Sequence, residues 1–320
     1  MSRGVAYMKT NHNAHFPIVV TAGSNYLDID AFACMVALAE LLQQKGEKAI
    51  AYSSAPYNYS VCDFLIEKGQ ILSALPSEYQ NAATKYAIVD VSDPEYIKDS
   101  VDIQKVAAVY DHHIGFEEYW QSRIKDNAHI EFIGAAATLI WREWKAAGLE
   151  DKISVSSARL LIAAILDNTL NLTASNTTDE DIQCFNELCK RTGVGKEWCA
   201  LYFRAVQENI EADLKNALFK DLKIVSDNKI LPRRVAQLCI WDAERVLGRL
   251  DEIRRWFAEG TGDWMINIID INNRCSYFVC DNEDYQKRIG DLFKIEFNSG
   301  VAKTPEAYLR KQMIKKTVCN

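Results

Sequence analysis

Three short apolar segments of the chain end close to aspartate or histidine residues, and this repetition constrains the fold more than any other feature. The segments are residues 18–22, which precede Asp28 and Asp30; residues 86–89, which end at Asp90; and residues 106–110, which run into Asp111, His112 and His113. Short apolar runs between helical patterns are typical of strands in a parallel sheet. The carboxyl ends of such strands meet in one crevice, so the polar side chains are expected to converge there.

Strand and helix patterns alternate through the first two-thirds of the chain. Strands are expected at residues 18–22, 48–53, 86–90 and 105–110, and helices at residues 31–45, 61–67, 135–147, 154–166 and 180–189. This alternation predicts an α/β domain, with a doubly wound and mainly parallel sheet covered by helices on both faces.

The last third has a different pattern, which predicts a second, smaller α+β domain with a sheet of its own. Strands are expected at residues 223–225, 234–240, 264–270 and 277–280, with a helix at residues 243–258. A charged helical connection at residues 198–219 joins the two parts. We place the boundary inside it, giving domains of residues 1–205 and 206–320.

Composition narrows the class of protein. A hydrophobic content of 48% in 320 residues is enough for a substantial core, and no apolar run is long enough to cross a bilayer. A net charge of −7 argues against a broad nucleic-acid-binding surface. Nine cysteines without CxxC spacing suggest reduced thiols, and the start of the chain lacks the apolar region of a secretory signal. A cytoplasmic protein that does not bind membranes is expected.

An aspartate at the end of a strand is often only a cap for the following helix, and Asp28 or Asp90 alone could have that role. Adjacent histidines are harder to explain in this way, because His112 and His113 in a core would leave several polar atoms in need of partners. Imidazole and carboxylate groups are ligands of Mn²⁺, Mg²⁺ and Zn²⁺. The combination therefore predicts a metal site.

These motifs resemble those of the DHH phosphoesterase superfamily, in the branch with the second type of DHH-associated C-terminal domain. That branch contains family II inorganic pyrophosphatases, yeast-type exopolyphosphatases and prune proteins. The matching segments cover nearly the whole chain in the family's order: Asp28-Ile29-Asp30-Ala31, Asp90, Asp111-His112-His113, the small-residue helix start at residues 134–138, and Leu166-Asp167-Asn168-Thr169-Leu170.

The resemblance implies a centre of two divalent metal ions, Mn²⁺ or Mg²⁺. Its ligands would be Asp28, Asp30, Asp90, His112 and Asp167, with Asp90 bridging the two ions. His113 would donate to a substrate phosphate oxygen, and Asp111 would fix the orientation of an imidazole. Two ions can lower the pKa of a water and clamp both oxygens of an in-line displacement.

The resemblance also assigns substrate-binding cations to the second domain. Lys223, in Asp221-Leu222-Lys223, matches an Asp-x-Lys element, and Arg310-Lys311 resembles a Ser-Arg-Lys element that binds substrate. The alternative is that Arg310 and Lys311, with Lys315 and Lys316, form only the solvated face of a terminal helix.

The chain departs from the pyrophosphatase pattern at several positions. Ser24 stands where pyrophosphatases carry a metal-binding histidine, and Leu309 replaces the serine before Arg310. The second motif reads Asp90-Val91-Ser92-Asp93 instead of Asp-His-Asn. Shifting the fourth motif by one residue puts Asn168 in the place of the ligand aspartate, although Asp167 is the better ligand by charge.

The leading hypothesis is a metal-dependent phosphohydrolase that cleaves phosphoanhydride bonds, resembling exopolyphosphatases or pyrophosphatases. Its substrate would be a small phosphate compound: polyphosphate, pyrophosphate or a small nucleotide. A phosphodiesterase acting on small cyclic or oligonucleotides is the second hypothesis, and a catalytically degenerate phosphate-binding homologue is the third. A homodimer is compatible with all three hypotheses.

Overall fold

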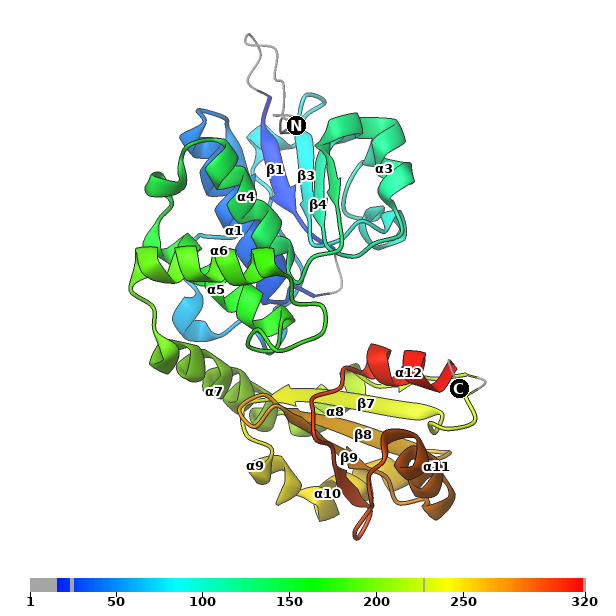
Figure 1. Ribbon diagram of the computed structural model, residues 1–320. Helices are drawn as coiled ribbons and strands as arrows, with labels where there is room; N and C mark the ends of the chain where they lie inside the picture. Colours follow the sequence, from blue (N-terminus) through cyan, green and yellow to red (C-terminus); the bar gives the residue numbers. More distant parts are fainter. Residues whose placement is uncertain (1–15, 24–25, 227, 319–320) are drawn as a thin grey trace. The chain divides into compact units, whose positions relative to one another are not determined.

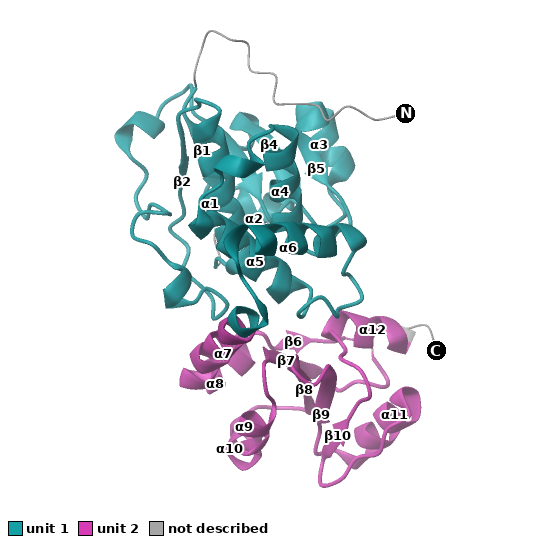
Figure 2. Ribbon diagram, turned by 60° about the vertical axis from the view of Figure 1, so that its left-hand side comes forward, with its two compact units in different colours: residues 1–199 teal, residues 200–320 magenta. Residues whose placement is uncertain are grey.

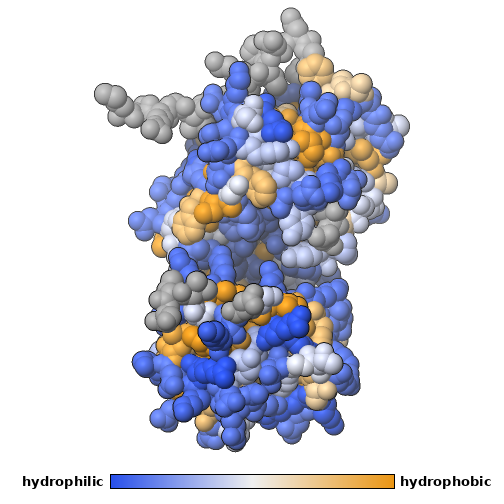
Figure 3. All heavy atoms as spheres, turned by 90° about the vertical axis from the view of Figure 1, so that its right-hand side faces the viewer, coloured by the Kyte–Doolittle hydropathy of each residue, from blue (hydrophilic) through white to orange (hydrophobic). Residues whose placement is uncertain are grey.

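The computed structural model describes residues 16–23, 26–226 and 228–318, so Ser24 lies outside the described residues. The chain divides into two compact units, Met1–Cys199 and Ala200–Asn320 (Figure 2). On the face drawn in Figure 3, apolar residues are interspersed among hydrophilic ones. Within the described residues, the helices are too short or too polar to cross a membrane.

The sheet of the first unit has five parallel strands in the order β2-β1-β3-β4-β5. The strands are β1 (Ile18–Thr21), β2 (Ala49–Ala51), β3 (Lys85–Val89), β4 (Val106–Asp111) and β5 (Ala128–Ile130). The chain leaves β1 in one direction to form β2 and then crosses back to form β3. Strand order therefore reverses between β1 and β3, the place where open α/β sheets bind ligands.

Helices cover this sheet on both faces, with α1 and α4 on one side and α3 on the other (Figure 1). The helices of the unit are α1 (Ile29–Gln44), α2 (Pro94–Ile97), α3 (Glu117–Ile124), α4 (Ala136–Ala146), α5 (Val155–Asn168) and α6 (Asp179–Thr192); α7 (Lys196–Ala212) spans the division between the units. The doubly wound α/β fold predicted from the sequence is confirmed.

Local sequence explains where several of these helices begin and end. Asp28 caps α1, because its Oδ1 accepts a hydrogen bond from the Ala31 amide at 2.9 Å. Thr178 and Asp181 form a reciprocal capping box at the start of α6, which ends at Gly193 in the left-handed conformation.

The prediction of a helix at residues 61–67 is wrong, because the structure has only a short 3₁₀ turn there, Asp63–Leu65. Val61 and Leu65 are buried, but Phe64 between them is 46% exposed. A segment this short forms a helix only where packing offsets the cost of starting it.

The second unit contains a five-stranded mixed sheet in the order β10-β9-β8-β7-β6. Among the described strands of this unit, only β7 and β8 pair in parallel. The strands are β6 (Lys223–Ile224), β7 (Arg234–Ile240), β8 (Trp264–Asp270), β9 (Cys275–Val279) and β10 (Val301–Lys303); the helices are α8 (Leu214–Lys220), α9 (Glu244–Leu247), α10 (Leu250–Ala258), α11 (Glu283–Phe293) and α12 (Arg310–Val318). This agrees with the predicted α+β class. This sheet has five described strands, as the sheet of the first unit does, although the second unit has fewer residues than the first.

Candidate metal centre

Asp90 follows β3 directly, at the point where strand order reverses. Its backbone has a φ of 57°, a left-handed conformation that is uncommon for any residue other than glycine. The Asp90 amide donates to the Tyr110 carbonyl at 2.8 Å, which holds this conformation against the end of β4. Backbone strain of this kind is concentrated at functional sites.

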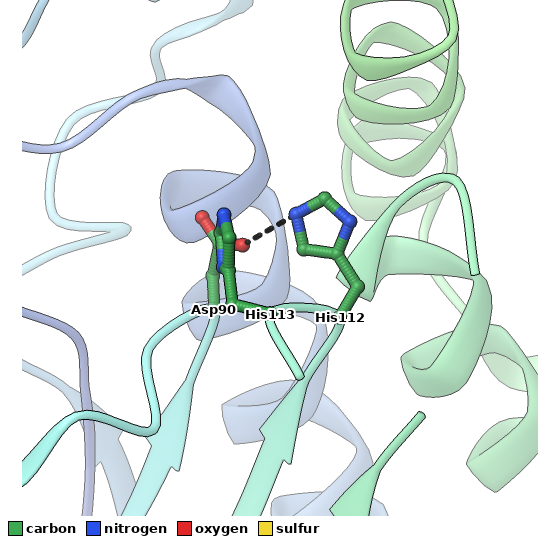
Figure 4. A group of neighbouring side chains, drawn as sticks. All are labelled: Asp90, His112 and His113. Atoms are coloured by element: carbon green, nitrogen blue, oxygen red, sulfur yellow. Dashed lines mark ion pairs between the residues drawn. The ribbon is translucent and has the colours of Figure 1, made fainter. Parts of the chain in front are cut away.

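His112 lies at the end of the neighbouring strand β4. Its Nδ1 is 3.2 Å from the Ile133 carbonyl oxygen, which can only accept, so Nδ1 carries the proton. The unprotonated Nε2 then faces Asp90, 3.4 Å from Oδ1 (Figure 4). Burial, followed by the nearby His113, lowers the pKa of His112 to about 4. The ring is therefore neutral at pH 7 and has a free lone pair, as a metal ligand requires.

His113 has a different environment from its neighbour. Its Nδ1 lies 2.8 Å from Oδ1 of the buried Asp111, which also accepts the His113 amide at 3.0 Å. The hydrogen bond with Asp111 raises the pKa of His113, against the opposing effect of burial. The side chain is 66% exposed. Asp111 thus orients His113 and favours its protonated form.

Asp90, His112 and His113 each offer a ligand atom, and these atoms all lie within 4.8 Å of one another. No other group of three or more carboxylate, histidine or cysteine residues meets this condition in the described part of the chain. Asp90 Oδ1 and Asp111 Oδ2 are buried and make no hydrogen bond. A buried carboxylate oxygen without a donor is costly, and a cation would offset that cost. Asp90 and His112 therefore fit as ligands of a divalent metal ion, and His113 lies beside them.

Two further aspartates from the start of α1 converge on Asp90. Burial raises the pKa of Asp90 well above its ordinary value, and the charges of Asp28, Asp30 and Asp111 raise it further. Asp28 also shares a hydrogen bond with Asp90. Mutual repulsion of this kind requires the four carboxylates to be close together. A bound cation would relieve it.

Asp30 is fully buried, and four donors surround its carboxylate. Oδ1 accepts from the Ala137 amide at 2.8 Å and from Cys34 Sγ at 3.4 Å. Oδ2 accepts from the Ala136 amide at 2.8 Å and from Asn168 Nδ2 at 3.0 Å. Burial, followed by the charge of Asp28, raises the pKa of Asp30 to about 7.

In the fourth motif, residues 166–170, Asn168 donates a hydrogen bond to Asp30. Asn168 and Asp167 are adjacent at the end of α5, and both are partly buried. The amide group of Asn168 donates to Asp30 at 3.0 Å, so the residue of this motif that contacts Asp30 here is a neutral donor.

The three basic residues assigned to substrate binding lie in the second unit, in different environments. Lys223 on β6 and Lys311 on α12 are exposed. The Arg310 side chain is only 9% exposed, and its guanidinium contacts both carboxylate oxygens of Asp221 at 2.6 and 3.0 Å. It also donates to the Val235 carbonyl at 3.2 Å. Arg310 is therefore not part of a solvated helix face.

Sequence reasoning did not identify Asp181 or Asn176, which contact the residues 134–138 that hold Asp30. Asp181 accepts from the Gly134 amide, and Asn176 donates to the Gly134 carbonyl. The capping-box pattern of Thr178 and Asp181 was a visible signal of helix initiation. The sequence contained no sign that the same carboxylate also contacts a segment more than forty residues away.

A nucleotide substrate would need aromatic side chains that can stack on its base, but those in α3 and just before it are packed into the core. Trp120 is buried and donates to the Ser92 carbonyl at 2.6 Å, while Phe116 and Tyr119 pack against the same core. Tyr26 is 58% exposed. Ile114, which follows His113 in sequence, and Phe132, which precedes the Ile133 carbonyl that contacts His112, are 61% and 64% exposed.

The fold and this site define a two-unit α/β protein with a candidate divalent-metal centre at the switch point of its parallel sheet. No family model matches the chain. An Exiguobacterium sp. protein named as a probable manganese-dependent inorganic pyrophosphatase is 24% identical over 318 residues, covering 92% of this chain and 96% of that protein. A Lactobacillus helveticus protein of the same name is 24% identical over 303 residues, covering 90% and 93%.

Two solved structures share the fold along nearly the whole chain. A Methanococcus jannaschii protein assigned as a family II inorganic pyrophosphatase aligns with a TM-score of 0.61 at 16% identity, covering 94% of this chain and 99% of that one. An exopolyphosphatase-related protein from Bacteroides fragilis aligns with a TM-score of 0.51 at 15% identity, covering 94% and 90%. The predicted resemblance to the DHH phosphoesterase superfamily is confirmed.

Proposed function

We propose that this protein is a divalent-metal-dependent phosphohydrolase that cleaves phosphoanhydride bonds. The observation that carries the proposal is the convergence of Asp90, His112 and His113 from two neighbouring strand ends, with a buried Asp90 oxygen that makes no hydrogen bond. The relatives named as manganese-dependent inorganic pyrophosphatases support the same class of reaction. We expect Mn²⁺ or Mg²⁺ as the cofactor.

Asp28, Asp90 and His112 are the core of the proposed ligand set, with Asp30 and either Asp167 or Asn168 completing it around two ions. When bound, the ions would supply Lewis acidity, lower the pKa of a water and neutralise charge on the phosphoryl oxygens. His112 presents a lone pair at Nε2, because the Ile133 carbonyl holds the proton on Nδ1. Asp28 and Asp90 contribute negative charge from α1 and β3.

His113 and Asp111 are proposed to act on the substrate. Asp111 accepts a hydrogen bond from the Nδ1–H group of His113, and this bond fixes the plane of the ring. Nε2 of the exposed imidazole can then hold a proton and donate it to a phosphate oxygen. The raised pKa of His113 keeps more of this group protonated at neutral pH than an ordinary histidine would be.

Substrate charge requires cations as well as metals. Lys223, Arg310 and Lys311 are proposed to bind the outer phosphates of polyphosphate, pyrophosphate or a small nucleotide, as the resemblance implies. Arg310 offers the planar fork that suits phosphate. Because the guanidinium of Arg310 is paired with Asp221, it would have to bind phosphate while keeping this pair, or release Asp221 to bind phosphate.

A phosphodiesterase that acts on small nucleotides is the second candidate function. The exposed side chains of Ile114 and Phe132 favour it. Ile114 follows His113 in sequence, and Phe132 precedes Ile133, whose carbonyl contacts His112. The segment from Asp111 to Glu118 contains no lysine or arginine. Apolar and acidic residues around the site suit a nucleotide, whose planar base can pack on them, better than they suit inorganic polyphosphate.

Hydrolysis assays with and without metal test the proposal. We expect the protein to be inactive after exhaustive chelation and to recover phosphate release from pyrophosphate or tripolyphosphate when Mn²⁺, Mg²⁺ or Co²⁺ is added. Activity that survives chelation would contradict a metal-dependent mechanism. If metal restores cleavage of a small phosphodiester but not of these anhydrides, the second candidate function is correct.

A further inference from the structure

We propose that Asp181 is a positioning residue for the metal centre, acting through the first turn of α4 on Asp30. This inference rests on the proposed function, because it assigns Asp181 a role in the same centre. The amides of Ala136 and Ala137 donate to Asp30. The carboxylate of Asp181, on α6, contacts Gly134 and Thr138, which lie on either side of those two amides in sequence.

The first turn of α4 holds Asp30 through its backbone. Ala135, the N-cap residue, has no side-chain oxygen with which to cap the helix. The amides of Ala136 and Ala137 instead donate to the two carboxylate oxygens of Asp30, each at 2.8 Å. A helix N-terminus stabilises negative charge through such free amides. The place of the Asp30 carboxylate therefore depends on where this turn lies.

Asp181 fixes the turn from the other side. Its Oδ2 accepts the Gly134 amide at 2.9 Å, and its Oδ1 accepts the Thr138 hydroxyl at 2.6 Å. Gly134 and Thr138 flank the two amides that bind Asp30. Asp181 is fully buried, so these bonds are not shared with solvent. Hydrogen bonds to a buried charged group are among the strongest in proteins.

The contact is close enough to require glycine at position 134. A Cβ there would lie 2.4 Å from Asp181 Oδ2 and 2.7 Å from Cγ2 of Thr169. Asn176 supports the same arrangement by donating to the carbonyls of Gly134 and Asn168, both at 3.3 Å. Asn168 in turn donates to Asp30. Asp181 and Asn176 therefore contact the groups next to Ala136, Ala137 and Asn168, the three residues that donate hydrogen bonds to Asp30 from outside α1.

Asp181 also has an ordinary structural role, which a test must separate from positioning. Its Oδ2 accepts from the amide and hydroxyl of Thr178 in the capping box of α6. Loss of this box would lower stability without any special effect on metal binding. Thr138→Val separates the two roles, because it removes the hydrogen bond from Thr138 on α4 to Asp181 and leaves the capping box of α6 intact.

The test is the Mn²⁺ dissociation constant of the full chain, measured by titration calorimetry alongside thermal unfolding. We expect Asp181→Asn to weaken Mn²⁺ binding by about tenfold or more, and Thr138→Val by a smaller factor in the same direction. The matched control is Leu188→Ala, a cavity in the buried face of the same helix α6, outside the contacts of Asp181. It should lower the unfolding temperature and leave Mn²⁺ affinity unchanged.

Amide hydrogen exchange gives a second reading that does not depend on metal. Asp181→Asn and Thr138→Val should speed exchange at Ala136 and Ala137 more than Leu188→Ala does. The inference is overturned if Thr138→Val and any folded Asp181→Asn bind Mn²⁺ as tightly as the unmodified chain, or if Leu188→Ala weakens binding equally. Failure of the unmodified chain to bind any divalent ion would instead overturn the proposed function, and this inference with it.

Discussion

Asp90 has two features that destabilise the fold without a bound cation. Its left-handed backbone costs about 1–2 kcal/mol for a residue with a side chain. Its carboxylate is buried beside three other carboxylates, and one oxygen makes no hydrogen bond. Neither feature is needed to end a strand, so we attribute both to the function of the site.

Two substitutions of Asp90 should separate backbone strain from ligand chemistry. Asp90→Gly relieves both features, so in chelator it should unfold at a temperature equal to or above that of the unmodified chain. Asp90→Ala keeps the strain and should be less stable than Asp90→Gly by about 1 kcal/mol. Both should lose metal-dependent hydrolysis by much more than tenfold, about 1.4 kcal/mol of barrier. The exposed Asp99→Ala is the control, and activity within tenfold in either Asp90 variant would exclude its role as a ligand.

Asn168 gives a prediction in the opposite direction. Asn168→Asp replaces the donor beside buried Asp30 with a second carboxylate, so the metal-free protein should unfold at a lower temperature because of like-charge repulsion. Mn²⁺ should bind about tenfold more tightly, because the new group is a charged ligand. Calorimetric titration and melting in chelator measure both effects. Unchanged Mn²⁺ affinity, together with a large loss in Asp167→Asn, would show that position 167 faces the metal.

His129 gives a stability prediction that depends on pH. Its ring stacks on Tyr110, with centroids 4.6 Å apart, and burial lowers its pKa below the ordinary 6.5. The folded state therefore favours the neutral ring, so its contribution is complete above pH 6.5 and is lost as the pH falls below that value. Urea unfolding at pH 7.5 and pH 5.5 should show a larger loss in the unmodified chain than in His129→Phe. Equal losses would mean that His129 is not the group responsible.

The sequence predicted the convergence of Asp90, His112 and His113, because strand ends in a parallel sheet are fixed by topology. It could not choose between Asp167 and Asn168, since one residue along a helix turns the side chain by about 100°. The role of Asp181 was also not predictable. It depends on a tertiary contact between two helix starts, and the capping-box pattern alone does not reveal it.

Among the elements, two strands of the second unit were predicted with the correct bounds, whereas the short strands β5 and β10 were not predicted. Residues 234–240 and 264–270 coincide with β7 and β8, because both are mainly apolar segments that contain β-branched residues and follow a polar one. The helix expected at residues 243–258 divides into α9 and α10 at Gly248 and Arg249. The connection expected at residues 198–219 divides at Asp213. These breaks depend on packing, which periodicity does not report.

Helix α3 was not predicted, and Trp120 holds it in place. Trp120 is completely buried in the core that α3 shares with β3 and β4, and its indole donates to the Ser92 carbonyl. Trp120→Phe keeps most of the apolar volume but leaves this buried carbonyl without its donor. We expect a loss of about 1–3 kcal/mol in the free energy of unfolding, measured in urea. Trp120→Ala should cost more, about 3–5 kcal/mol. No loss in Trp120→Phe would show that water replaces the indole.

At the scale of the whole molecule, the candidate metal ligands and the proposed phosphate-binding cations belong to different units. Arg310 is a poor choice for testing the cations. Its guanidinium is buried and paired with Asp221, so Arg310→Ala would destabilise the second unit whether or not the residue meets substrate. Lys223 and Lys311 are exposed, and changing them should leave the fold intact.

Lys223→Ala and Lys311→Ala should therefore show whether the second unit takes part in hydrolysis. Each removes a charge that we propose binds an outer phosphate, so kcat/KM for tripolyphosphate should fall by tenfold or more, about 1.4 kcal/mol. The loss for a small phosphodiester should be lower, because that substrate has no outer phosphates. Lys315→Ala, an exposed cation on the same helix as Lys311, is the matched control. Equal losses on both substrates would remove the preference for a polyanion, and no loss on either would leave Lys223 and Lys311 as solvated surface charges.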